Sequence, residues 1–140
     1  MLVTACGPAL RAEPLAASPA ARRLIAAARR QVGVTLAYDP AYTALDYPLG
    51  DVPRERGVCT DVLIRAYRDA LAIDLQREVH GDMTAHFAAY PRRWGLRGPD
   101  RNIDHRRVPN LQTYWSRMGA RLPLPADPEG WRPGDVFTSL

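Results

Sequence analysis

Residues 57–70, GVCTDVLIRAYRDA, decide how this chain folds. Apolar residues recur in this stretch at the spacing of one helix face: Val62, Leu63, Ala66, Tyr67 and Ala70. The spacing predicts an amphipathic helix over about 59–70. We expect Arg65, Arg68 and Asp69, which fall between the apolar positions, to face water. Cys59 then lies in the first turn, where the partial positive charge of the helix dipole favours a thiolate.

Two roles are open for Cys59. A thiolate at a helix start is a working nucleophile, but a free cysteine is also among the most buried residue types and often fills a core. Asp61 follows two positions later, so its side chain points to another face and is a poor direct partner for the thiol. We expect Asp61 to be a first-turn acid that favours the helix dipole and works slightly against a thiolate.

Helices are also predicted on both sides of this stretch. Ser18 and Pro19 suit an N-cap and a first helical position, and Gly33 suits a stop. Later, Gly81 and Asp82 interrupt a helical pattern, with Asp82 as the cap of its second half. The predicted helices cover about 19–32, about 75–90 with a break at 81–82, and a segment from Pro109 to Gly119.

Extended structure is expected at two places. Residues 34–38 are β-prone and precede a long irregular loop over 39–57, and residues 131–138 form a turn that leads into a strand. Helices followed by the beginning of a sheet indicate an α+β domain. We expect one domain over 19–140, with a sheet that continues beyond residue 140, and a signal remnant or flexible tether over 1–18.

Charge and composition exclude several classes of function. The 140 residues carry a net charge of +4, and all 19 basic residues are arginines. The arginines are scattered and do not interleave with aromatic residues, which favours solvated helix faces over a nucleic-acid surface. There is no stretch of about 18 apolar residues that could span a membrane. Metal-ligand spacings and phosphate-binding glycine loops are also missing, so we expect neither metal nor cofactor.

Cys6 has a different context from Cys59. Small residues precede it in Leu2-Val3-Thr4-Ala5-Cys6, as at the end of a bacterial lipoprotein signal. A complete signal has a charged start and an apolar stretch of roughly 7–15 residues. Either the start at Met1 is misplaced and Cys6 receives a lipid that attaches the protein to a membrane, or the similarity is chance.

A nucleophilic Cys59 needs a base, and three histidines are candidates at neutral pH. His80 sits near a predicted helix break and His86 on the solvent side of a helix. His105 lies in the dense polar segment 102–110, beside Asp104 and Arg106. That segment is either part of a site or a loop held by hydrogen bonds of its short polar side chains.

Four separated motifs together resemble the domain of unknown function 1287 family, which is grouped with the NlpC-type, papain-like cysteine peptidases and amidases. They are GVCTDV at 57–62, AYPRRWGL at 89–96, NIDHRRVPNLQ at 102–112 and WRPGDV at 131–136. The resemblance implies a helical N-terminal half that packs on an antiparallel sheet. It places Cys59 at the nucleophile position and the turn at 133–135 before the first sheet strand.

The resemblance also implies a histidine base on a following strand. Either the chain is a fragment whose sheet is truncated at residue 140, or His105 supplies the imidazole. In the first case Asp104, His105 and Arg106 form a substrate-facing or structural motif.

The function implied is a cysteine hydrolase, an amidase or peptidase, that acts on peptidoglycan peptides in the cell envelope, in the periplasm or as a membrane-anchored lipoprotein. We expect a monomer. The alternatives are a non-catalytic envelope-associated binding module and an acyl or lipid hydrolase.

Overall fold

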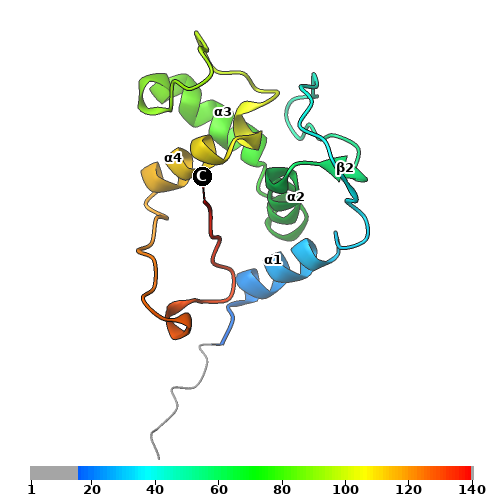
Figure 1. Ribbon diagram of the computed structural model, residues 1–140, viewed down its shortest axis with the longest axis vertical. Coiled ribbons are helices and arrows are strands. Elements are labelled where there is room, and N and C mark those ends of the chain that lie inside the picture. The colour runs from blue at the N-terminus through cyan, green and yellow to red at the C-terminus, as the bar shows by residue number, and fades with distance from the viewer. Residues whose placement is uncertain (1–15, 140) are drawn as a thin grey trace, which may run out of the picture.

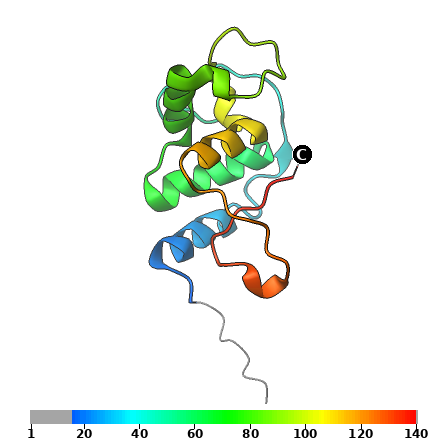
Figure 2. The same cartoon turned by 90° about the vertical axis from the view of Figure 1, so that its left-hand side faces the viewer.

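Four α-helices form the body of the protein in the computed structural model, which describes residues 16–139. Helix α2 lies in the middle, with α1 on one side and with α3 and α4 on the other (Figures 1 and 2). The helices are α1 (Pro19–Arg29), α2 (Cys59–Leu71), α3 (Leu75–His86) and α4 (Val108–Arg117). There are two short strands, β1 (Ala37–Tyr38) and β2 (Arg56–Gly57). There are also three 3₁₀ turns, η1 (Phe87–Ala89), η2 (Asp104–Arg106) and η3 (Pro128–Gly130).

The hydrophobic core lies between α2, α3 and α4. Its fully buried members are Ile64, Leu75, Val79, Met83, Tyr90 and Leu111. Each of the three helices presents one apolar face to this cluster, as the 3.6-residue period requires. The first helix adds little to the core: its one buried residue is Ala27, and it covers α2 from the outside.

The sheet differs from the expectation. Strands β1 and β2 are parallel, with Ala37 opposite Arg56 and Tyr38 opposite Gly57, so the predicted antiparallel sheet is wrong for the described residues. The long loop between the two strands supplies the crossover that a parallel pair needs. The predicted strand after residue 131 is also missing: there is a turn at 133–134, but residues 135–139 have no strand partner. The mixed helix-and-strand class is confirmed.

The helix predictions hold except at four points. Helix α3 ends at His86 rather than near 90, and residues 87–89 form the 3₁₀ turn η1. Helix α1 ends at Arg29 rather than at 32. Helix α3 runs through Gly81 without the predicted break. Asp82 does not cap a helix, because its carboxylate accepts hydrogen bonds from Tyr90 and Arg117, at 2.6 and 2.7 Å. It therefore joins α3 to the following turn and to α4.

The predictions for the N-terminus lie mostly outside the described residues. Cys6, the proposed lipid site, and residues 1–15 of the predicted tether are not among them. Ser18 does cap α1, since its hydroxyl accepts the Ala21 N–H at 3.1 Å. Among the described helices, none combines the length and the apolar composition of a membrane span.

Candidate functional site around Cys59

Cys59 is the first residue of α2, and its thiol is free and exposed. The two N-terminal amides of this helix, those of Cys59 and Thr60, donate to no group among residues 16–139. Unpaired first-turn amides and the helix dipole together attract negative charge. A thiol here is accessible to a substrate and has hydrogen-bond donors beside it, which rules out the core-filling role.

The first turn of α2 is held by Asp61. Its Oδ2 accepts the N–H of Val58, the N-cap residue, at 2.7 Å. Valine has no acceptor to return the bond, so the carboxylate of Asp61 supplies half of a capping box. The prediction that Asp61 is a first-turn acid is confirmed by this contact.

Arg106 of η2 binds the same carboxylate in a two-pronged ion pair. Its Nε lies 2.9 Å from Asp61 Oδ1 and its Nη2 2.9 Å from Oδ2. The side chains of both residues are almost fully buried. The carbonyl of Arg106 also accepts the Thr60 hydroxyl at 2.8 Å. Segment 104–106 is thus attached to the helix turn that carries Cys59.

His105 lies on the same 3₁₀ turn but faces the interior. It is 2% exposed, its Nδ1 has no hydrogen-bond partner, and no hydrogen bond joins it to Cys59. Burial lowers the pKa of His105 to about 4, and the nearby Asp61 only partly opposes this effect. The imidazole is therefore neutral at neutral pH. The structure brings His105 close to the cysteine-bearing element without pairing the two side chains.

Asp104 is buried as well, at 1% exposure. Its carboxylate accepts the backbone N–H of Asp100 and pairs with Arg107, while its carbonyl accepts from Asn110. Burial raises the pKa of Asp104. The charged groups of Asp104 and Arg106 are thus both bound by other groups of the protein. Their predicted contact with a substrate stays a prediction.

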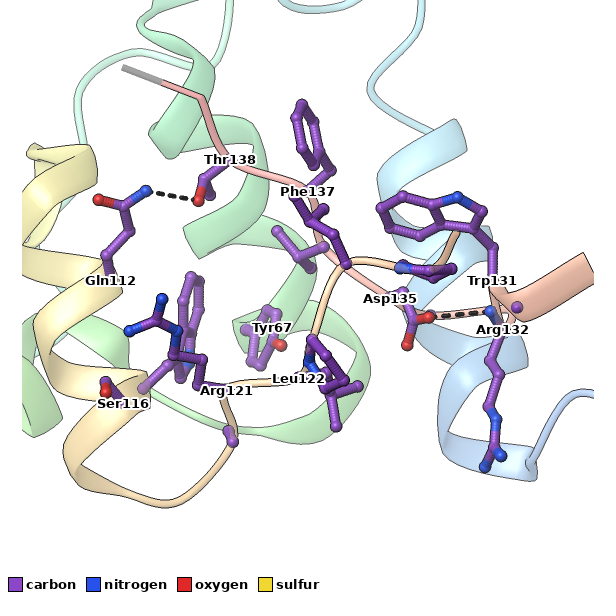
Figure 3. A pocket seen from close by; sticks show the side chains of 18 residues that line it. Tyr67, Gln112, Ser116, Arg121, Leu122, Trp131, Arg132, Asp135, Phe137 and Thr138 are labelled. Carbon is purple, nitrogen blue, oxygen red and sulfur yellow. Dashed lines mark hydrogen bonds between the residues drawn. The ribbon is translucent and has the colours of Figure 1, made fainter. Parts of the chain in front are cut away.

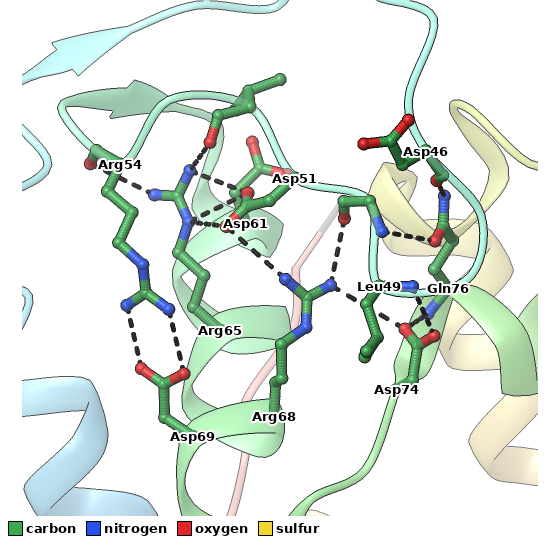
Figure 4. A network of polar contacts seen from close by, with 12 residues as sticks. Asp46, Leu49, Asp51, Arg54, Asp61, Arg65, Arg68, Asp69, Asp74 and Gln76 are labelled. Carbon is green, nitrogen blue, oxygen red and sulfur yellow. Dashed lines mark hydrogen bonds and ion pairs between the residues drawn. The ribbon is translucent and has the colours of Figure 1, made fainter.

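A second polar network, which the sequence did not indicate, holds the loop 39–57 (Figure 4). At its centre Arg65 of α2 is 0% exposed, although we expected it to face water. Its guanidinium forms an ion pair with Asp51, at 2.9 Å, and donates to the carbonyls of Val52 and Arg56, at 3.0 and 3.1 Å. The long loop bends over this face of α2, so Arg65 is covered and Arg68 is mostly covered, while Asp69 is exposed as expected.

Further side chains fix the same loop to the start of α3. Gln76 accepts the N–H of Gly50 at 2.9 Å and donates to the carbonyl of Asp46 at 3.0 Å. Asp74, the N-cap of α3, accepts the N–H of Leu49 at 2.9 Å. A short-range sequence pattern could identify the cap but not these partners, which lie 25 or more residues away along the chain.

A large cleft lies away from Cys59. It has a volume of about 1130 Å³ and opens between the segment after α4 and helices α2 and α4 (Figure 3). Aromatic side chains line it, among them Tyr67, Trp115, Trp131 and Phe137. Cys59 is not part of its wall. The described residues contain no group of three or more histidine, cysteine or acidic side chains that could hold a metal ion.

Comparisons with known proteins agree with the motif resemblance. The model of the family described as "Domain of unknown function (DUF1287)" matches residues 25–140. The chain is 56% identical over 111 residues to "Uncharacterized protein YijF" of Escherichia coli (strain K12). That match covers 79% of this chain and 54% of the relative, so the chain spans about half of the relative's length. No solved structure matches the chain.

Proposed function

The chain belongs to the DUF1287 family, and we propose that its domain is a thiol-dependent hydrolase, an amidase or peptidase on a papain-like, NlpC-type scaffold. The proposed substrate class is the peptide part of peptidoglycan, and the proposed site of action is the cell envelope. The observation that carries the proposal is the exposed free thiol of Cys59 at the first position of a 13-residue helix.

The chemistry follows from the groups around the thiol. In the proposed reaction the sulfur of Cys59 attacks an amide carbonyl, and the C–N bond breaks as the amine leaves with a proton. In this proposal the amides of Cys59 and Thr60, which have no acceptor among the described residues, donate to the oxyanion that forms. Water then hydrolyses the thioester and returns the free thiol. No metal is needed for any of these steps.

The proton acceptor is a separate question. A base is most effective when its pKa lies near the working pH, and the pKa of His105 is about 4. The proposal therefore rests on Cys59, and the base role of His105 stays a prediction. His105→Gln decides it: a base at this position means a large loss of kcat with a changed pH–rate profile, whereas an unchanged rate would exclude it.

The direct test of the proposal is cleavage of purified peptidoglycan. Release of new amino groups should fall by about a thousandfold or more in Cys59→Ala. Cys6→Ala, the matched control for the other cysteine of the sequence, should keep the rate of the starting protein. Full activity of Cys59→Ala would overturn the proposal.

The same assay separates the alternatives. Binding of peptidoglycan by both Cys59→Ala and the unmodified protein, with cleavage by neither, would identify a non-catalytic envelope module. Cleavage of acyl esters but not of peptide amides would identify an acyl hydrolase instead.

A further inference from the structure

Asp61, in the same helical turn as Cys59, forms an ion pair with Arg106 of η2, and this pair has no place in the chemistry described above. We infer that these two are positioning residues for Cys59: the pair fixes the first turn of α2 and cancels the negative charge that Asp61 alone would place beside the thiol. The inference rests on the proposed role of Cys59 as nucleophile. Both side chains are almost fully buried, so the inference concerns their effect on Cys59 and not a contact with substrate.

The geometry supports the positioning part. Arg106 joins three segments at once, because its guanidinium also donates to the carbonyls of Asp39 and Ala41, each at 3.3 Å. The hydroxyl of Thr60 also donates to the carbonyl of Arg106. These bonds fix the positions of η2, the loop after β1 and the start of α2 relative to one another. A bidentate guanidinium–carboxylate pair fixes orientation as well as distance.

Close packing behind the turn points the same way. Gly57 precedes the N-cap with φ of +151°, and a Cβ there would lie 2.6 Å from Asp61 Oδ2. The backbone therefore approaches the carboxylate as closely as a glycine permits. The carboxylate has no free space in which to turn, so its charge stays at one place relative to Cys59.

The charges near the turn decide the electrostatic part. Asp61 is the acid of the turn itself, and η2 contributes Arg106, the neutral His105 and Asp104, which is paired with Arg107 at 3.4 Å. On the strand side, Arg56 is paired with Asp39 at 3.4 Å. With these three ion pairs intact, the positive end of the helix dipole is left uncompensated at Cys59.

The other packed elements reach α2 further along the helix. From α1, Gln31 donates to the carbonyl of Val62 and Arg23 to that of Ala70. From the start of α3, Asp74 faces Arg68 at 3.8 Å. The Asp61–Arg106 pair is thus the charged contact made directly with the first turn.

The test uses two substitutions that break the same ion pair from opposite sides. In a Cys6→Ala background, the rate of alkylation of Cys59 by iodoacetamide is measured from pH 5 to 10. Asp61→Asn leaves the Arg106 charge unbalanced and should move the midpoint of the pH–rate profile down by about half a pH unit or more. Arg106→Gln leaves the carboxylate unbalanced and should move the midpoint up by a similar amount.

A purely structural role would move both variants in the same direction, or neither, and either result would overturn the inference. Arg106→Lys keeps the charge and should restore most of the midpoint. Asp69→Asn removes an acid from the far end of α2, beyond about one Debye length, and should leave the midpoint unchanged. If Arg106→Gln does not fold, Asp61→Asn decides alone: a downward shift supports the inference, and an unchanged or raised midpoint rejects it.

The measurement is independent of hydrolysis. If the protein proves not to cleave peptidoglycan, the shifts in the pH–rate profile of alkylation are still expected. Conversely, absent shifts in a protein that still needs Cys59 for cleavage would reject the positioning pair and keep the nucleophile.

Discussion

Gly57 is the residue that allows the first turn of α2 to close on the Asp61 carboxylate. Its positive φ of 151° is a conformation that residues with a side chain rarely adopt, and the added Cβ would overlap Asp61 Oδ2. The position of Cys59 thus depends on a neighbour with no functional group. The backbone conformation and the close approach to the carboxylate together explain this requirement for glycine.

We therefore expect Gly57→Ala to lower the free energy of unfolding by about 1–3 kcal/mol, because it combines backbone strain with a displaced buried carboxylate. The measurement is urea denaturation followed by circular dichroism. Gly81→Ala is the matched control: Gly81 lies inside α3 with open space where its Cβ would be, so alanine should stabilise by about 0.5–1 kcal/mol. Equal effects of the two changes would contradict this account of Gly57.

His105 gives the stability a pH dependence whose sign follows from its burial. Its pKa falls from 6.5 to about 4 on folding, so between these values the unfolded chain binds a proton that the folded protein does not. This group therefore costs no stability above pH 6.5, and stability is lost as the pH falls toward 4. The loss amounts to about 3 kcal/mol for this group.

The comparison that isolates this loss is with His105→Asn, a side chain that does not titrate. The difference in unfolding free energy between the two proteins should change in favour of the variant as the pH goes from 7 to 4. Urea denaturation at several pH values measures it. Parallel pH profiles would show that the imidazole is not kept neutral by the fold.

At the scale of elements, the loop 39–57 depends on Arg65 for its path. A loop of this length without regular structure has few backbone bonds of its own, and the guanidinium satisfies several of its carbonyls from within α2. Asp51 balances the charge of the guanidinium, so this ion pair is the centre of the polar contacts that hold the loop. Removing Arg65 leaves the loop carbonyls without this donor, while Asp51, whose side chain is 21% exposed, keeps only the more distant Arg68, at 3.7 Å.

We expect Arg65→Met to lower the free energy of unfolding by about 3–5 kcal/mol. Arg54→Met, which removes a surface pair with Asp69 at 2.9 Å, should cost about 1 kcal/mol or less. Both are measured by chemical denaturation under the same conditions. A cost for Arg65→Met as small as that for Arg54→Met would show that backbone packing alone holds the loop.

The same element shows where sequence reasoning ends. The period of 57–70 predicted α2 to within one residue at its C-terminal end, because burial of an apolar face is a local pattern. The pattern also assigned Arg65 to solvent, because it cannot include a loop that covers the opposite face. Asp61 was correctly predicted as a first-turn acid, but its partner Arg106 lies 45 positions away and no local signal connects them.

At the scale of the whole molecule, the protein has a tightly connected part and a loosely connected part. Helices α2 to α4, η2 and the loop 39–57 share buried side chains and ion pairs. Residues 119–139 are mostly exposed and lie across the large cleft, with a Gln112–Thr138 hydrogen bond of 2.8 Å and close packing of Gly134 on Ala21. The parallel pair β1–β2 belongs to the first part, whereas residues 135–139, where the sheet was predicted to begin, have no strand partner.

This division predicts the order in which trypsin cuts the folded protein. Proteases cleave where a segment opens at little cost, so the bond after Arg121 should be cut well before the bond after Arg56, although both arginines are exposed. The carbonyl of Arg56 accepts from Arg65 and its neighbour Gly57 is buried. Time-resolved proteolysis with mass spectrometry measures both rates, and Arg65→Met should accelerate the cut after Arg56 alone. If the bond after Arg56 is cut first in the unmodified protein, the loop is not held as described; if Arg65→Met accelerates both cuts equally, the two parts unfold as one.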